Sequence, residues 1–136
     1  MGPDAFDFWL GEWDCVTSAG DAVNTVTREY NEKVIIERFH IHSPQEWSGM
    51  SISSYNEHDG WRQTWVDQDS NYWTFQGVLV DGDPAFATAG KVDIDQNYKR
   101  MIFFDIAPDA LNWRWEISPD GETWTERMTA AYTRKR

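Results

Sequence analysis

The sequence predicts an all-β fold: a closed, antiparallel up-and-down barrel of about ten strands with a short N-terminal helix. Clusters of Asn, Asp, Gly and Pro recur at short intervals, and such clusters form turns. Between them lie runs rich in Val, Ile, Thr, Phe, Tyr and Trp, which suit a pleated sheet. Connections of hairpin length pair neighbouring strands antiparallel, and closure into a barrel removes unpaired edges. The 136 residues (1–136) are therefore expected to form one domain.

The elements follow in order along the chain. Pro3 and Asp4 open a short helical turn that is expected to run to Trp9, and Gly11 ends it. After this turn, no window shows the apolar spacing of a helix over three turns. Ten strands are expected at residues 11–18, 22–30, 33–42, 46–55, 61–68, 72–80, 85–94, 99–107, 110–118 and 122–134.

Charge and composition exclude several classes of partner. The net charge of −11 repels nucleic acid and anionic lipid, so neither is an expected partner. No apolar run is long enough to span a membrane, and acidic residues interrupt the aromatic N-terminus, so we expect no signal peptide and a cytoplasmic location. The single cysteine, Cys15, excludes an internal disulfide and is expected to be a small buried side chain.

Nine Trp residues exceed what a core of this size needs, and strand alternation gathers several of them on single faces. Stacked indoles on an outer face would be exposed to water, so we expect these faces to point into the barrel. The residues on these faces are Trp61, Gln63, Trp65 and Asp67 of strand 61–68, Trp73 and Phe75 of strand 72–80, and Trp113 and Trp115 of strand 110–118. The sequence thus predicts a Trp-lined cavity that binds a ligand.

Three polar residues, Gln63, Asp67 and Glu37, are candidate ligand contacts. An acid in a Trp-lined space has its charged form disfavoured unless a donor meets it, so it would orient a ligand or act as an acid or base. The alternatives are structural. Asp67 would cap the turn that follows it, and Glu37 would be a buried partner of Arg28 or Arg62. Alternation leaves open whether Glu37 points inward or outward.

The histidines do not form a predicted metal site. His40 and His42 share one face of a strand, but Glu37 lies on the opposite face and no further His or Cys completes a ligand set. We therefore expect a solvent-facing or locally bonded pair and no metal.

The opening stretch FDFWLGEWDC (6–15) resembles the start of a family of small bacterial domains, the DUF1579 group. Three further stretches fit the same family: YNEHDGWRQTWVD at 55–67, SPDGETW at 118–124 and AYTRK at 131–135. Together these matches span almost the whole chain.

The resemblance implies a calycin-type barrel, the structural class of lipocalins, fatty-acid-binding proteins and nitrobindins. In that class a Gly-x-Trp opens the first strand, and a basic residue near the end of the last strand packs on its Trp. Gly11-Glu12-Trp13 matches the first feature, and Arg134 is the best match for the second, with Arg136 next. A guanidinium over an indole contributes about 0.5–2 kcal/mol. Haem-binding relatives use a late axial His, and none follows His58, so we expect neither haem nor another cofactor.

Three hypotheses of function follow. The first is binding of a small hydrophobic or aromatic molecule in the Trp-lined cavity. The second is a cofactor-independent isomerase, cyclase or hydro-lyase in which Glu37 or Asp67 transfers a proton. The third is a homodimeric interaction module without a ligand, with the aromatic side chains on its outer face.

Overall fold

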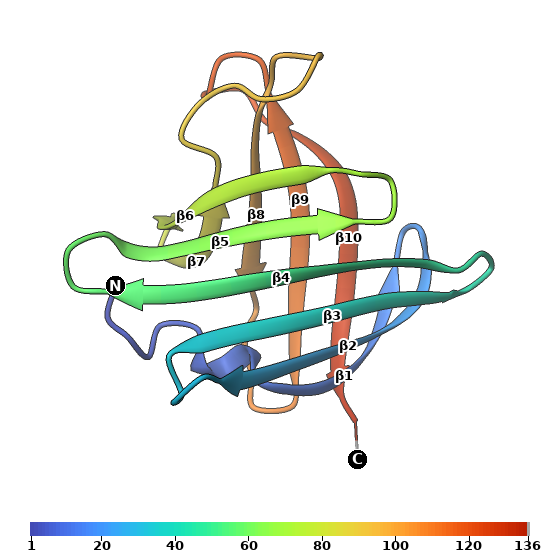
Figure 1. Cartoon of the computed structure of the whole chain (residues 1–136). Coiled ribbons are helices and arrows are strands. Elements are labelled where there is room, and N and C mark those ends of the chain that lie inside the picture. The colour runs from blue at the N-terminus through green and yellow to red at the C-terminus, as the bar shows by residue number, and fades with distance from the viewer. Residues whose placement is uncertain (136) are drawn as a thin grey trace.

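Ten antiparallel strands form a closed barrel in the computed structural model, which describes residues 1–135 (Figure 1). Each strand pairs with its neighbours along the chain, and β1 pairs with β10 to close the ring. The strands are β1 (Gly11–Thr17), β2 (Gly20–Glu29), β3 (Val34–Ser43), β4 (Trp47–Asn56), β5 (Gly60–Asp67), β6 (Tyr72–Val80), β7 (Asp83–Ala87), β8 (Tyr98–Phe104), β9 (Ala110–Ser118) and β10 (Thr125–Arg134). The prediction of an all-β antiparallel barrel of about ten strands is confirmed.

The seventh strand is much shorter than predicted, and the eighth ends at Phe104 instead of residue 107. The expected strand 85–94 is β7, which already ends at Ala87, and a long connection follows it to Tyr98. Asp93 and Gln96 have φ angles of 63° and 53°, in the left-handed region that turns favour over strands. The only bridge within this connection joins Val92 to Asn97. Turn chemistry therefore outweighs the β propensity of the residues after Ala87.

The last strand also begins later than predicted, at Thr125 instead of residue 122. Asp120 holds the preceding turn, because its Oδ1 accepts hydrogen bonds of 2.8 Å from the backbone N–H groups of Glu122 and Thr123. These two residues therefore satisfy their backbone donors in the turn and do not extend the ladder.

The N-terminal segment forms a smaller helix than predicted, the 3-10 helix η1 (Asp7–Trp9). Its aromatic side chains fill one end of the barrel. Phe6 stacks on Phe86 with ring centroids 4.4 Å apart and meets Trp61 edge-on at 5.2 Å. Trp9 lies 5.3 Å from Phe103. Because Phe6 and Trp9 are fully buried, we call residues 2–9 the plug.

The predicted contact between Trp13 and Arg134 is confirmed. The two residues are cross-strand partners of β1 and β10, and the Arg134 guanidinium carbon lies 4.1 Å from the Trp13 ring centroid. Arg134 also donates hydrogen bonds to the carbonyls of Leu10 (2.7 Å) and Pro108 (3.0 Å). Gly11 has a φ angle of 130°, which favours glycine, and the missing Cβ leaves room for the Arg134 guanidinium. Arg136, the second candidate, lies outside the described residues.

The two barrel ends differ in their contents (Figure 1). Since the strands alternate in direction, successive connections alternate between the ends. The plug shares its end with the β2–β3, β4–β5, β6–β7 and β8–β9 connections, and we call this the plug end. The other five connections form the open end. No helix in residues 1–135 has the length and apolar character to cross a membrane.

Candidate functional site

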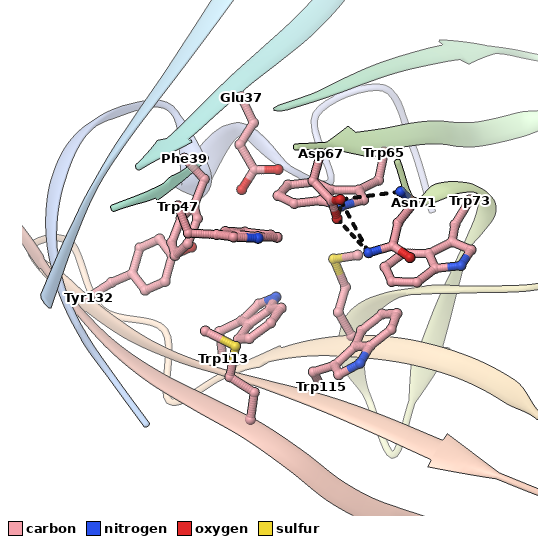
Figure 2. A pocket seen from close by; sticks show the side chains of 12 residues that line it. Glu37, Phe39, Trp47, Trp65, Asp67, Asn71, Trp73, Trp113, Trp115 and Tyr132 are labelled. Atoms are coloured by element: carbon pink, nitrogen blue, oxygen red, sulfur yellow. Dashed lines mark hydrogen bonds between the residues drawn. The ribbon is translucent and has the colours of Figure 1, made fainter. Parts of the chain in front are cut away.

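A cavity of about 170 Å³ lies at the open end of the barrel (Figure 2). Trp47 at the start of β4 and Asn71 in the β5–β6 connection mark its mouth. Most of the lining side chains are aromatic or apolar, and five of them are Trp. The lining residues are Glu37, Phe39, Trp47, Trp65, Asp67, Asn71, Trp73, Met101, Trp113, Trp115, Met128 and Tyr132.

Two stacked indole pairs form much of the wall. Trp47 and Trp65 lie 6.1 Å apart with an interplanar angle of 22°, and Trp73 and Trp115 lie 5.2 Å apart at 28°. Gly49 makes the first pair possible, because a Cβ at this position would overlap the six-membered ring of Trp65. The missing side chain on β4 therefore allows an indole from β5 to lie against the strand.

Aspartates at the open end fix the orientation of three indoles. Each indole N–H donates a hydrogen bond to a carboxylate oxygen, which leaves the ring faces for packing and for the cavity. The pairs are Trp47 with Asp69 (2.8 Å), Trp65 with Asp67 (2.8 Å) and Trp73 with Asp93 (2.7 Å).

Asp67 has the structural role that was one of its two predicted alternatives. Its Oδ1 accepts from the backbone N–H of Asp69 at 2.9 Å and of Asn71 at 3.2 Å. Its Oδ2 accepts from Trp65 Nε1 and from Asn71 Nδ2 at 3.0 Å. Although Asp67 lines the cavity, its oxygens are already occupied by the turn and the wall.

Glu37 points inward, which resolves the ambiguity of the third strand (Figure 2). Asn24 Nδ2 donates to its Oε2 at 2.8 Å, and Ser51 Oγ donates to its Oε1 at 2.7 Å. Burial raises the pKa of the Glu37 carboxyl above its ordinary value, and these two hydrogen bonds offset part of the effect. Glu37 is 7% exposed and is the acid deepest in the cavity wall.

The predicted arginine partners of Glu37 are wrong. Arg28 pairs with Asp7 at 2.6 Å, and Arg62 pairs with Asp59 at 3.4 Å. Within residues 1–135, no cationic side chain lies within ion-pair distance of Glu37. The carboxyl group instead relies on neutral donors from the two adjacent strands.

A chain of buried polar groups continues from Glu37 to the first and last strands. Asn24 Nδ2 also donates to the Tyr132 hydroxyl at 2.9 Å, and Tyr132 is close to Cys15. Burial raises the pKa of Tyr132 well above its ordinary value and that of Cys15 to about 12. Both groups are therefore neutral near physiological pH, and Cys15 is buried as predicted.

Six of the nine predicted ligand contacts line the cavity together: Glu37, Trp65, Asp67, Trp73, Trp113 and Trp115. Three do not. Trp61 lies at the plug end, where its Nε1 donates to the Gly2 carbonyl at 2.9 Å. Gln63 is buried below the cavity and donates to Ser53 Oγ at 3.0 Å. Phe75 packs edge-on behind Trp115 with ring centroids 5.9 Å apart.

The prediction missed six lining residues, although most of them follow the same inward alternation. Phe39 lies two residues after Glu37 on β3, and Tyr132 lies two residues before Arg134 on β10. Trp47 begins its strand, where alternation gives the weakest signal. The missed residues are Phe39, Trp47, Asn71, Met101, Met128 and Tyr132.

The histidines lie outside the cavity. His40 Nδ1 is 2.6 Å from Ser48 Oγ, and its Nε2 is 3.7 Å from Glu46. Across residues 1–135, no group of three or more His, Cys, Asp or Glu side chains is arranged to hold a metal ion.

Comparison with known proteins gives no assignment, since no protein-family model and no curated protein matches the chain. The interpretation of the site therefore depends on its geometry and chemistry.

Proposed function

We propose that this protein binds a small hydrophobic or aromatic molecule of one or two rings in the Trp-lined cavity. The observation that carries this proposal is a cavity of about 170 Å³ with five Trp side chains and one buried carboxyl group in its wall. An apolar protein cavity of about 150 Å³ is large enough to bind benzene. Such a space suits a compact ring system better than a long acyl chain.

The wall combines the two properties of a ligand pocket. The indole faces of Trp47, Trp65, Trp73, Trp113 and Trp115 offer apolar area and stacking, which provide affinity. A few fixed polar groups, Glu37 above all, would set the orientation of the ligand. Because aspartates hold three of the indoles in place, little side-chain freedom is lost on binding.

We also propose that the barrel is of the calycin type and related to the DUF1579 group. The order of the strands around the closed barrel supports this relationship. So do the Gly11-Glu12-Trp13 start of β1 and the Arg134 guanidinium over the Trp13 ring. A ligand cavity inside the barrel is the property that the proposed relationship implies.

Titration with toluene and p-xylene, followed by Trp fluorescence and calorimetry, tests binding. We expect saturable changes in emission and a negative heat-capacity change, because apolar surface is buried. Free N-acetyltryptophanamide is the control for non-specific quenching. Emission that changes in the protein only as it does in this control, without saturation, would contradict the proposal.

A second candidate function is proton transfer without a cofactor, and the environment of Glu37 favours it. A buried carboxyl group with a raised pKa inside a cavity has the properties of a general acid or base. Asp67 fits this role less well, because its oxygens already accept hydrogen bonds from Trp65 and Asn71. Deuterium uptake by cyclic ketones in D₂O, measured by NMR, tests it. Glu37→Gln should abolish the uptake while leaving ketone affinity within a few-fold.

A further inference from the structure

The cavity holds a buried carboxyl group without a cationic partner. Glu37 accepts hydrogen bonds from Asn24 and Ser51, which are both neutral. A carboxylate taken out of water is costly unless an opposite charge compensates for it. In the described chain no cation does so, and the carboxylate faces the cavity (Figure 2). A positively charged ligand would supply the missing charge.

The surrounding indoles favour the same kind of ligand. The face of an indole ring carries negative electrostatic potential and attracts cations. Trp47, Trp65 and Trp73 each donate the indole N–H to a carboxylate. Those N–H groups are therefore not available to an acceptor on a ligand, and the bound carboxylates make the rings richer in electrons. Three of the five indoles in the wall thus offer their faces to a cation and no free N–H group to an anion.

The ionic groups at the open end leave an excess of negative charge. Lys99 lies 5.4 Å from the Trp73 ring centroid, so this indole already contacts one cation in the protein itself. Two carboxylates, those of Asp93 and Asp95, each lie 3.2 Å from the Lys99 ammonium and together exceed its charge by one. In residues 1–135, no cationic side chain lies within ion-pair distance of Asp67 or Asp69.

We propose that the ligand of this cavity is an organic cation, a small aromatic or apolar molecule that carries a protonated amine or quaternary ammonium group. The cationic group lies between the indole faces and is directed at Glu37, while the apolar part fills the rest of the cavity. The proposal rests on the small-molecule binding proposed above and specifies its chemical class. The net charge of −11 would also raise the local concentration of such a ligand.

A matched pair of probes separates the effect of charge from the effect of shape. Phenyltrimethylammonium and tert-butylbenzene share one skeleton, in which the cation has nitrogen in place of a carbon atom, and benzoate serves as the anionic probe. Near neutral pH we expect the cation to bind at least about tenfold more tightly than the neutral hydrocarbon. We expect no saturable binding of benzoate. Fluorescence and calorimetry with the unaltered protein measure all three.

The variant Glu37→Gln tests the role of the carboxylate. Its amide oxygen still accepts from Asn24, and its NH₂ group can donate to Ser51. We expect this variant to bind phenyltrimethylammonium at least about tenfold more weakly than the unaltered protein does. Its affinity for tert-butylbenzene should change by no more than about twofold. Glu126→Gln is the matched control, because it removes one negative charge from an exposed position on β10.

A pH titration of the unaltered protein provides the same test without a variant. Phenyltrimethylammonium does not titrate, so its affinity should fall with decreasing pH as Glu37 is protonated. The groups that face Glu37 from β1, β2, β4 and β10 are Cys15, Asn24, Ser51 and Tyr132, and none of them is charged near neutral pH. Asp67 is the other carboxyl group of the cavity, and the Lys99 ammonium lies 5.4 Å from the ring centroid of Trp73 in the wall. His40 is on the outward face of β3.

Three outcomes would overturn the inference. Equal affinity for phenyltrimethylammonium and tert-butylbenzene would refute the cation preference and leave ligand binding intact. A cation preference that survives in Glu37→Gln and does not depend on pH would refute the assignment of Glu37. Absence of saturable binding for both compounds and for toluene would refute the proposed function itself.

Discussion

The guanidinium of Arg134 lies over the ring of Trp13, with 4.1 Å between the guanidinium carbon and the ring centroid, and this contact joins the last strand to the first. The same guanidinium donates hydrogen bonds to the carbonyls of Leu10, the residue that follows the plug, and Pro108, before β9. One side chain therefore stabilises both the closure of the barrel and the attachment of the plug.

Replacing this side chain should destabilise the whole barrel. We expect Arg134→Ala to lower the free energy of unfolding by about 2–4 kcal/mol, because it removes a cation–π contact and charged hydrogen bonds. Arg127→Ala, at an exposed position of the same strand, should change it by less than about 0.5 kcal/mol. Urea unfolding measures both values. Equal stability of the two variants would show that the contact does not stabilise the closure.

Gly49 tests how the cavity wall is built. In Gly49→Ala the new Cβ would overlap the Trp65 ring, so the Trp47–Trp65 pair must separate. We expect a loss of about 1–3 kcal/mol in the free energy of unfolding and at least about tenfold weaker binding of toluene. Gly90→Ala is the control, since a Cβ there meets no atom within 4 Å. Unchanged toluene affinity in Gly49→Ala would argue against this wall as the binding surface.

Variants at the two ends of the barrel should affect different properties, stability at the plug end and ligand binding at the open end. Trp61→Phe removes the hydrogen bond to the Gly2 carbonyl and part of the packing around Phe6. It should lower the free energy of unfolding by about 1–3 kcal/mol and leave toluene affinity within about twofold. Trp113→Phe, in the cavity wall, should weaken toluene binding at least about fivefold at nearly unchanged stability. A loss of affinity in Trp61→Phe alone would place the site at the plug end.

The stability of the ligand-free protein should depend on pH through Glu37. Burial raises its pKa above the ordinary value of 4.5, so the folded protein holds this proton more tightly than the unfolded chain does. The resulting stabilisation is complete below 4.5 and is lost as the pH rises through the raised pKa. Relative to Glu37→Gln, the wild type should therefore lose free energy of unfolding as the pH rises from 4.5. Urea unfolding over a pH series measures the difference between the two proteins. A difference that stays constant with pH would contradict the prediction.

Cys15 should not react in the folded state. Its thiol is buried, and its pKa is raised to about 12, mainly by burial and also by the neighbouring Glu37. Because the thiolate is the reactive form, Ellman's reagent should not label the native protein at mildly alkaline pH. One thiol should react in concentrated guanidinium chloride. Rapid labelling of the native protein would show that the β1 wall opens.

Alternation predicted which side chains point inward, but it did not predict how far each lies along the barrel axis. Trp61, Gln63, Trp65 and Asp67 all belong to one face of β5, yet the plug covers Trp61 and the cavity contains only the last two. That division depends on which end the N-terminal segment enters. This is a long-range packing event, and strand periodicity carries no signal for it.

The environment of Glu37 shows a second limit of the sequence. An arginine partner was the expected way to compensate a buried acid, but Arg28 pairs with Asp7 in the plug segment instead. The actual donors, Asn24 and Ser51, become neighbours only through the pairing of β3 with β2 and β4. Their inward positions follow from alternation once the strands are known. Their contact with Glu37 could be predicted only from the register between β3 and its two neighbouring strands.

The pairing of β1 with β10 also affects how the chain is made. During synthesis, β1 leaves the ribosome first, but its second partner is complete only when Arg134 has emerged. Until then the sheet has two unpaired edges, and the Trp13 ring lacks the guanidinium that covers it. Contacts between such distant residues form slowly, and unpaired edges invite aggregation. The unfinished barrel is therefore most exposed to aggregation just before its last strand is released.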